Sequence, residues 1–366
     1  MPMRRLFILL VTSMAVGCTH VVADSPGSSA HRPANASECP KAVPEPFTGP
    51  LIVESKYVQE DQSKSTLKAR RSEQSEEVQR RIEGFTKGIV RFADFYLNNV
   101  QSRKGLAARA CVSVWLEAWA EADALTTDET SKTGVAVRKW ALASLSATLW
   151  KLKHVEGVRW SLSEAQSLWL EHLADKVIAD YGNRLDPEFS YFNNHDYWAA
   201  WSVAVTGVVV NRQDYLRWSI PFYQRAMGQV TTFAGGRYGY LPNELARKNL
   251  AANYTHYALV PLVLLSDILR KHGYVPSPEE DRKLDQLVSF SVQIILQPRS
   301  VREVVTGPQK DVPNYKLAWL IPYLNRYPDH ALAMALFARH NGNVDGYSQA
   351  GGKLRPVYGD VTSGSY

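Results

Sequence analysis

Three short segments combine polar side chains with aromatic rings beyond what helix packing requires. They span residues 192–201, 238–247 and 253–259. The first places Asn194 and His195 before an apolar run, so we expect an amide and an imidazole at a helix start, where free N–H groups favour anions. Arg247 and Tyr254 are seven residues apart, which predicts one face of a single helix. A guanidinium and a phenol on one face could hold a carboxylate and move a proton beside it.

Other kinds of active site have weaker support. The nine histidines show no His-Glu-x-x-His or comparable cluster, so we expect no metal and no cofactor. The glycine-rich segment 235–239 lacks the strand context of a phosphate or dinucleotide loop. Asp196 and Glu244 stay open as a carboxylate pair for glycoside hydrolysis. Each polar residue taken alone also has a plainer explanation, such as a helix cap or a surface contact.

The chain around these segments has a helical period almost throughout. Apolar residues at positions 78, 82, 85, 89, 92 and 96 are spaced by four and three, which places one apolar stripe on a helix. Ser161–Glu164 and Ser277–Glu280 are typical of capping boxes that open helices. Only Val203–Val210, rich in β-branched residues, could be a buried strand instead. Further helices are expected around 111–122 and 137–145, and over 161–181, 195–210, 212–229, 247–271, 277–297, 315–327 and 328–340.

This pattern predicts an all-α protein. With 366 residues, 45% of them hydrophobic, the chain exceeds the about 250–300 residues at which a single core usually stops growing. We therefore expect residues 51–340 to form a toroid of helical hairpins with a concave face, and a superhelical repeat stack is the alternative. Residues 341–366, rich in Gly and Ser, are expected to form a loosely packed tail.

The N-terminus is typical of a secretory signal. Arg4 and Arg5 precede an apolar run too short to span a membrane, which assigns residues 1–23 to a signal peptide. Two cleavage sites compete. Cleavage before Cys18 would leave a lipidated cysteine and hence a lipid anchor, whereas cleavage after Ala23 would leave none. Either one predicts an exported protein.

After cleavage, Cys39 and Cys111 are the two ordinary cysteines. In an oxidising compartment we expect them to form one disulfide, and two unrelated buried thiols are the alternative. The Pro-rich residues 24–50 should form an extended arm, and the charged stretch 54–77 should be mobile at least in part. The net charge of +6 is too small for a nucleic-acid binder but suits a groove for an acidic polymer.

Six blocks of sequence together resemble one enzyme family. They are Ser55–Tyr57, Arg138–Leu142, Asn193–Val203, Leu241–Leu245, Tyr254–Leu259 and Tyr315–Leu320. In their order and spacing the chain resembles the mannuronate-specific alginate lyases of polysaccharide lyase family 5, over roughly residues 38 to 330. It departs from that pattern at residues 248–250 and in the C-terminus.

The resemblance implies an incomplete (α/α) toroid in the periplasm, with a tunnel-like cleft and a mobile N-terminal lid loop. It implies an enzyme that cleaves alginate by β-elimination without a metal and leaves an unsaturated uronate at the new non-reducing end. The matching positions are Tyr254, His195, Arg247 and Asn194 for catalysis, Lys56 and Tyr57 in the lid loop, and Trp140 and Trp198 for substrate binding. We expect four basic side chains to meet the polyanionic sugar chain, namely Lys56, Arg138, Lys139 and Arg247.

The chemistry of a uronate fits these residues. Removal of the C5 proton makes a carbanion that the carboxylate stabilises, so Arg247 and Asn194 would neutralise that carboxylate, with His195 as a further donor. In mannuronate the C5 proton and the C4 oxygen lie on one side of the ring, so Tyr254 could serve as both base and acid. Its pKa, ordinarily near 10, would have to fall, and Arg247 and His195 could lower it. The alternative makes His195 the base and Tyr254 only the acid.

Two other functions stay open at this point. The same cleft could belong to a non-catalytic alginate-binding or scaffold protein, although a pure binder has no need of the Tyr254 phenol. It could also belong to a lyase for another polyuronate, such as glucuronan. A monomer is the default expectation for the oligomeric state.

Overall fold

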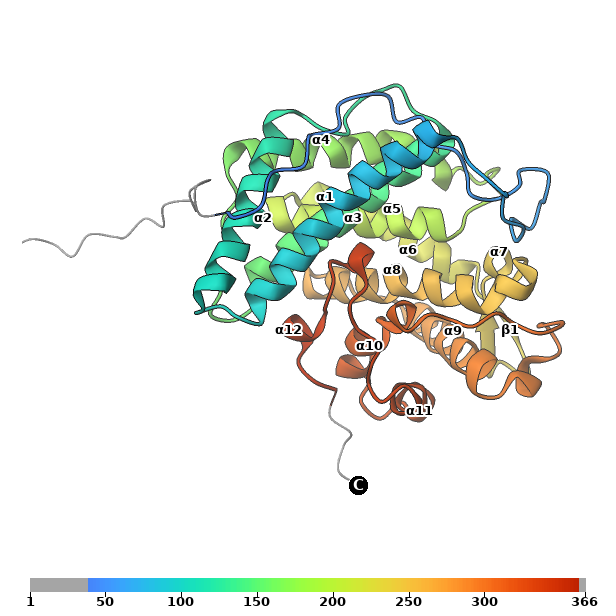
Figure 1. The fold of residues 1–366 in the computed structure, drawn as a ribbon. Coiled ribbons are helices and arrows are strands. Elements are labelled where there is room, and N and C mark those ends of the chain that lie inside the picture. Colours follow the sequence, from blue (N-terminus) through green and yellow to red (C-terminus); the bar gives the residue numbers. More distant parts are fainter. Residues whose placement is uncertain (1–38, 362–366) are drawn as a thin grey trace, which may run out of the picture. The chain divides into compact units, whose positions relative to one another are not determined.

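The computed structural model describes residues 39–361 (Figure 1). These residues are mostly helical. The predicted signal peptide and Cys18 lie outside them. The α-helices are α1 (Glu73–Leu97), α2 (Arg103–Glu121), α3 (Lys132–His154), α4 (Glu164–Tyr181), α5 (Asn194–Val210), α6 (Gln213–Gly228), α7 (Pro242–Leu245), α8 (Ala251–Lys271), α9 (Pro278–Leu296), α10 (Leu320–Arg326), α11 (Ala331–Arg339) and α12 (Arg355–Tyr358). The 3₁₀ turns are η2 (Gly182–Leu185), η3 (Lys248–Leu250), η4 (Pro298–Val301), η5 (Asn314–Leu317) and η6 (Ser348–Ala350).

Helix α5 is the central element of the fold. It packs against α3, α4, α6 and α8 (Figure 1). Val203–Val210, which could have been a strand, is helical. Almost every side chain of α5 is buried, which explains why its sequence is apolar on all sides rather than along one stripe. The first residues of α5 include the predicted catalytic residues Asn194 and His195.

One predicted helix start is confirmed and one is wrong. Ser277 caps α9 through the predicted capping box with Glu280. At α4 the cap is Ser163 with Gln166, not Ser161 with Glu164. The reason is tertiary, because Ser163 Oγ and Gln166 Nε2 both donate to Glu117 on α2, at 2.7 and 2.6 Å.

A small hairpin interrupts the helices, so the all-α prediction holds for the architecture but not for every element. Strands β1 (Thr231–Phe233) and β2 (Tyr238–Tyr240) pair antiparallel, with Phe233 opposite Tyr238. Gly235 and Gly236 form the turn between them with positive φ angles of 68° and 81°. The glycine-rich segment therefore has strands beside it after all, but it serves a hairpin turn.

The expectation of a loosely packed tail is wrong for residues 341–361. Val344, Ala350 and Leu354 have no exposed surface. The segment lies against α3 and contains η6 and α12. Short turns have no apolar period, so the sequence pattern could not show this packing.

The N-terminal arm is extended where the structure describes it. Residues 39–50 contain no helix or strand, and Phe47 is buried against the core. The predicted disulfide is confirmed, since Cys39 is bonded to Cys111 on α2 with a Cα–Cα distance of 4.7 Å. Within residues 39–361, no helix is long and apolar enough to cross a membrane.

Candidate active site

The four predicted catalytic residues lie where the start of α5 meets the start of α8. Arg247 is not on the same helix as Tyr254, as we predicted, because α7 ends at Leu245 and α8 begins only at Ala251. The turn between them still returns the guanidinium to the phenol, and its carbon lies 4.3 Å from the centre of the Tyr254 ring. The pair is formed by a turn rather than by helical spacing.

Glu244 joins the two helix starts. Its carboxylate accepts hydrogen bonds from the backbone N–H of Asn194 at 2.7 Å and from Asn194 Nδ2 at 2.9 Å. Asn194 Oδ1 and Arg247 Nε are buried and have no hydrogen-bond partner within residues 39–361. Buried polar atoms seldom lack partners. A bound molecule could therefore donate a hydrogen bond to Asn194 Oδ1 and accept one from Arg247 Nε.

Asp196 and Glu244 are not a pair of hydrolytic carboxylates. Both side chains have at most 1% of their surface exposed, and each is engaged with the backbone at the start of α5. Burial raises the pKa of Asp196 to about 6 and raises the pKa of Glu244 above its ordinary value. Glycoside hydrolysis needs two carboxylates that flank an accessible bond, which this arrangement does not provide.

His195 is a neutral imidazole whose ring contacts Lys139. Burial, followed by the charges of Lys139, Arg247 and Arg184, holds the pKa of His195 well below its usual range. Its Nδ1 lies 3.0 Å from Lys139 Nζ. Lys139 was expected to meet the polyanionic sugar chain, but its side chain has no exposed surface and contacts His195 instead.

Tyr254 is a protonated phenol in this state. Its hydroxyl donates to the Tyr57 hydroxyl at 2.7 Å. Burial, and after it this hydrogen bond, raises the pKa of Tyr254 above its ordinary value, although Arg247 lowers it. The expectation that the local environment lowers this pKa is therefore wrong, although Arg247 acts in the expected direction.

The loop of residues 54–71 reaches the same site. Besides Tyr57, it contributes the Ser63 carbonyl, which accepts from Arg247 Nη1 at 3.4 Å. Its tip is held by Asp61, whose carboxylate accepts from the backbone N–H groups of residues 63, 65 and 66. Lys56 is exposed, with Nζ 5.2 Å from the Tyr57 ring centre. In Figure 1 this loop, drawn in blue, extends towards α7.

Lys316 is a site residue that sequence reasoning missed. Its Nζ lies 4.8 Å from the centre of the Tyr257 ring and 5.8 Å from that of Tyr254, and it donates to Asn253 Oδ1. Burial, with the charge of Lys56, lowers the pKa of Lys316 to about 8. The Tyr315–Leu320 block, which we used only for the resemblance, was the signal that could have identified it.

Of the three residues predicted to bind substrate along the cleft, only Trp140 keeps a position that fits. It is partly exposed, and its ring centre lies 5.8 Å from that of His195. Trp198 has no exposed surface and packs beneath Tyr257, at 5.4 Å between ring centres. Arg138 is also buried, and its charge is engaged by Asp180 at 2.9 Å. Trp198 and Arg138 therefore support the site and do not face a substrate.

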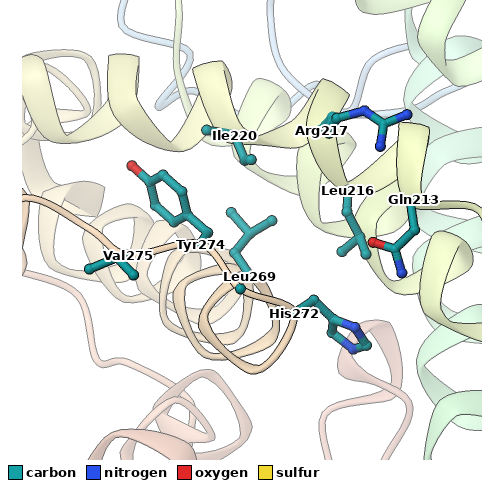
Figure 2. A pocket seen from close by; sticks show the side chains of 9 residues that line it. Gln213, Leu216, Arg217, Ile220, Leu269, His272, Tyr274 and Val275 are labelled. Atoms are coloured by element: carbon teal, nitrogen blue, oxygen red, sulfur yellow. The ribbon is translucent and has the colours of Figure 1, made fainter.

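Two further observations concern possible metal binding and a second cavity. Among residues 39–361, no three His, Cys, Asp or Glu side chains are grouped so that they could hold a metal ion. Figure 2 shows a separate cavity of about 320 Å³ between α6 and the end of α8. None of the predicted site residues lines it. Its lining is formed by Gln213, Leu216, Arg217, Ile220, Leu269, His272, Gly273, Tyr274 and Val275.

Comparison with known proteins identifies the family. The family model described as alginate lyase matches residues 52–301, which include all four predicted catalytic residues. This chain belongs to the alginate lyase family. An alginate lyase of Pseudomonas syringae pv. tomato is 32% identical over 329 residues, covering 87% of this chain and 82% of the relative. An alginate lyase of Azotobacter vinelandii is 33% identical over 309 residues, covering 81% and 78%.

Solved structures support the same fold for this alginate lyase family member. Alginate lyase A1-III in complex with a tetrasaccharide aligns with a TM-score of 0.66 and 19% identity, covering 90% of this chain and 88% of that one. Alginate lyase A1-III from Sphingomonas species A1 aligns with a TM-score of 0.63 and 18% identity, with the same coverage. At this identity the likeness shows the fold alone.

Proposed function

We propose that this protein cleaves 4-linked β-D-mannuronate in alginate by β-elimination that needs no metal. The observation that carries the proposal is the Arg247–Tyr254 pair, with a guanidinium 4.3 Å from a phenol ring beside the start of α5. Arg247 Nε, buried and without a partner in the described part of the chain, can bind the uronate carboxylate. Family membership supports alginate as the polymer.

The reaction breaks the C5–H and C4–O bonds and forms the C4=C5 double bond. As the C5 proton leaves, negative charge spreads onto the carboxylate, where Arg247 stabilises it with the His195 ring as a further donor. Tyr254 takes the C5 proton as a phenolate and returns it to the C4 oxygen. Tyr254 must break the hydrogen bond that it donates to Tyr57 as substrate enters, which removes one contribution that raises the Tyr254 pKa. Arg247 remains to lower it.

We also propose the finer features that the family implies. Residues 54–71 act as a lid over the site, because Tyr57 and Ser63 contact Tyr254 and Arg247 from outside the helices. The cleft beneath them is the tunnel of an incomplete toroid. The Cys39–Cys111 disulfide fits an oxidising compartment, which supports the periplasm as the location.

The central experiment replaces Tyr254 by Phe. Tyr254→Phe removes the proton carrier and keeps the ring against Arg247, so turnover of polymannuronate should fall by about 10²-fold or more. The absorbance of the unsaturated product measures the rate. Tyr223→Phe is the matched control, because Tyr223 is also buried but donates to Ser266. Substantial activity in Tyr254→Phe would refute the assignment.

A panel of polymers separates this function from its competitors. We expect unsaturated product from polymannuronate, and little from polyguluronate, hyaluronate or glucuronan. Product from glucuronan alone would instead indicate a lyase for another polyuronate. Binding of alginate without product from any polymer would indicate a non-catalytic binding protein.

A further inference from the structure

Lys139 lies directly beneath the start of α5. It comes from α3 and has no exposed surface. Its Nζ lies 3.0 Å from His195 Nδ1 and 3.2 Å from the His195 carbonyl oxygen. A carbonyl oxygen can only accept, and a lysine amino group has two N–H donors when it is neutral and three when it is charged. In either form it can therefore donate to both atoms of His195.

Two aromatic rings lie close to the amino group of Lys139. The ring centres of Trp140 and Tyr181 both lie 5.1 Å from Nζ, at distances typical of cation–π contacts. Burial holds the pKa of Lys139 well below its ordinary value, and Arg184 acts in the same direction, whereas the Asp196 carboxylate opposes this shift. Arg247 and Arg184 are the other cations that act on His195.

The other ring nitrogen of His195 is free. Within residues 39–361 the ring of His195 is hydrogen-bonded through Nδ1 and not through Nε2, and the backbone N–H of His195 donates to Asn193 Oδ1 at 2.9 Å. A neutral imidazole has one N–H, so a donor at Nδ1 places the hydrogen on Nε2. The hydrogen then belongs to the nitrogen that is not held by the protein.

We propose that Lys139 is a positioning residue that fixes His195 in the tautomer with hydrogen on Nε2. This rests on the proposed function and deepens it, because His195 is then a hydrogen-bond donor to the uronate carboxylate. It is not the base, since its only basic nitrogen faces Lys139. No bond to His195 forms or breaks during the elimination, and Tyr254 alone carries the proton.

The tautomer can be measured without any activity. In the protein labelled with ¹⁵N-histidine, the two ring nitrogens of His195 have distinct shifts, assigned by their loss in His195→Gln. At neutral pH we expect a hydrogen on Nε2 and a bare Nδ1. A hydrogen on Nδ1 would overturn the proposal, whatever the enzyme does with alginate.

Lys139→Met tests the role of the lysine itself. Loss of the donor should leave both tautomers populated, move the His195 pKa back towards its usual range and lower kcat by about 10²-fold, with little change in KM. If the variant kept Nε2–H alone, or full activity, Lys139 would not have this role. If the variant fails to fold, the wild-type spectrum still decides the tautomer.

Lys153→Met is the matched control. Lys153 also lies on α3 and donates to a carbonyl of α5, that of Val209 at 2.7 Å, but at the opposite end of the helix. It should leave the His195 spectrum and kcat unchanged. A wild-type protein with the expected tautomer but no lyase activity would refute the proposed function and leave the tautomer assignment intact.

Discussion

At the scale of single residues, the cations around Tyr254 differ in whether they can lose their charge. Arg247 carries a guanidinium, which is the cationic group that proteins use where a fixed charge is needed. Lys316 faces the same phenol, but burial lowers its pKa to about 8. The positive charge that meets an acidic polymer is therefore partly fixed and partly dependent on pH.

This difference predicts a pH dependence that belongs to Lys316. Below pH 8 the side chain is charged in the free enzyme, and as pH rises through 8 it becomes neutral and its attraction for the polyanion is lost. We expect kcat/KM on polymannuronate, relative to that of Lys316→Arg, to fall about fivefold between pH 7 and 9.5, which corresponds to about 1 kcal/mol.

The ratio to Lys316→Arg is the useful quantity because both enzymes share the ionisation of Tyr254, which cancels. The arginine remains charged throughout this range. Steady-state rates from the product absorbance at a series of pH values provide the measurement. A ratio that does not vary with pH would show that Lys316 does not titrate near 8 or does not meet the substrate.

At the scale of elements, buried charges fix how the helices and loops are joined. Arg138 on α3 donates to Asp180 on α4 and, at 2.9 Å, to the Leu125 carbonyl in the loop before α3. It also donates to the Thr127 carbonyl. One guanidinium thus connects two helices and the loop between α2 and α3, and it is neutralised where it lies.

We therefore expect Arg138→Leu to change stability and not substrate binding. The variant leaves Asp180 half-buried without its partner and two carbonyls without a donor, so the free energy of unfolding should fall by about 3 kcal/mol. KM for polymannuronate should stay within about twofold. Urea unfolding and steady-state kinetics on the same preparation measure both, and a large rise in KM with unchanged stability would restore Arg138 as a substrate ligand.

Arg138 and Trp198 also show how far the sequence could predict the site. Helical period and motif order correctly placed Asn194 and His195 at a helix start. A period of 3.6 shows that a side chain lies on an inner face, but the neighbouring helix decides whether that face is core or cleft. Arg138, Lys139 and Trp140 are consecutive but have different roles. Arg138 forms a structural ion pair, Lys139 contacts a histidine, and Trp140 has a partly exposed ring.

Neither helical period nor motif order predicted the turn that contains Arg247. Helical spacing suggested one continuous helix through Tyr254, whereas the chain inserts η3 before α8. The result for the pair was the same because η3 returns the guanidinium to the phenol. Only tertiary contacts, such as the bonds of Glu244 to Asn194, determine where that turn lies.

At the scale of the described chain, the C-terminal segment packs against the aromatic rings beside the predicted active site. Tyr347 packs against Trp198, with ring centres 5.8 Å apart, and Gln349 Nε2 donates to the Tyr257 hydroxyl at 3.4 Å. Residues more than 80 positions after Tyr254 therefore hold the rings beside it. The segment is itself fixed on α3, where Ser144 Oγ donates to the Ser348 carbonyl at 2.8 Å.

Gly351 is the residue that allows this close approach. Its φ is +81°, and a Cβ there would come within 2.7 Å of the Ala147 carbonyl carbon, which is backbone of α3 and cannot move aside. Gly346, in the same segment, has a φ of +97° but open space around it. Gly346→Ala should therefore cost only the about 1–2 kcal/mol of a left-handed alanine, whereas Gly351→Ala should cost a further about 1–3 kcal/mol of overpacking.

The two glycine variants also predict different effects on catalysis. Displacement of the segment by Gly351→Ala should withdraw Tyr347 and Gln349 from beneath Trp198 and Tyr257, so kcat should fall together with stability. Gly346→Ala should lower stability and leave kcat unchanged. Thermal unfolding and kinetics well below both unfolding temperatures separate the two effects. Equal losses in both variants would mean that backbone strain, and not contact with α3, sets the role of Gly351, and that the site does not depend on the C-terminal segment.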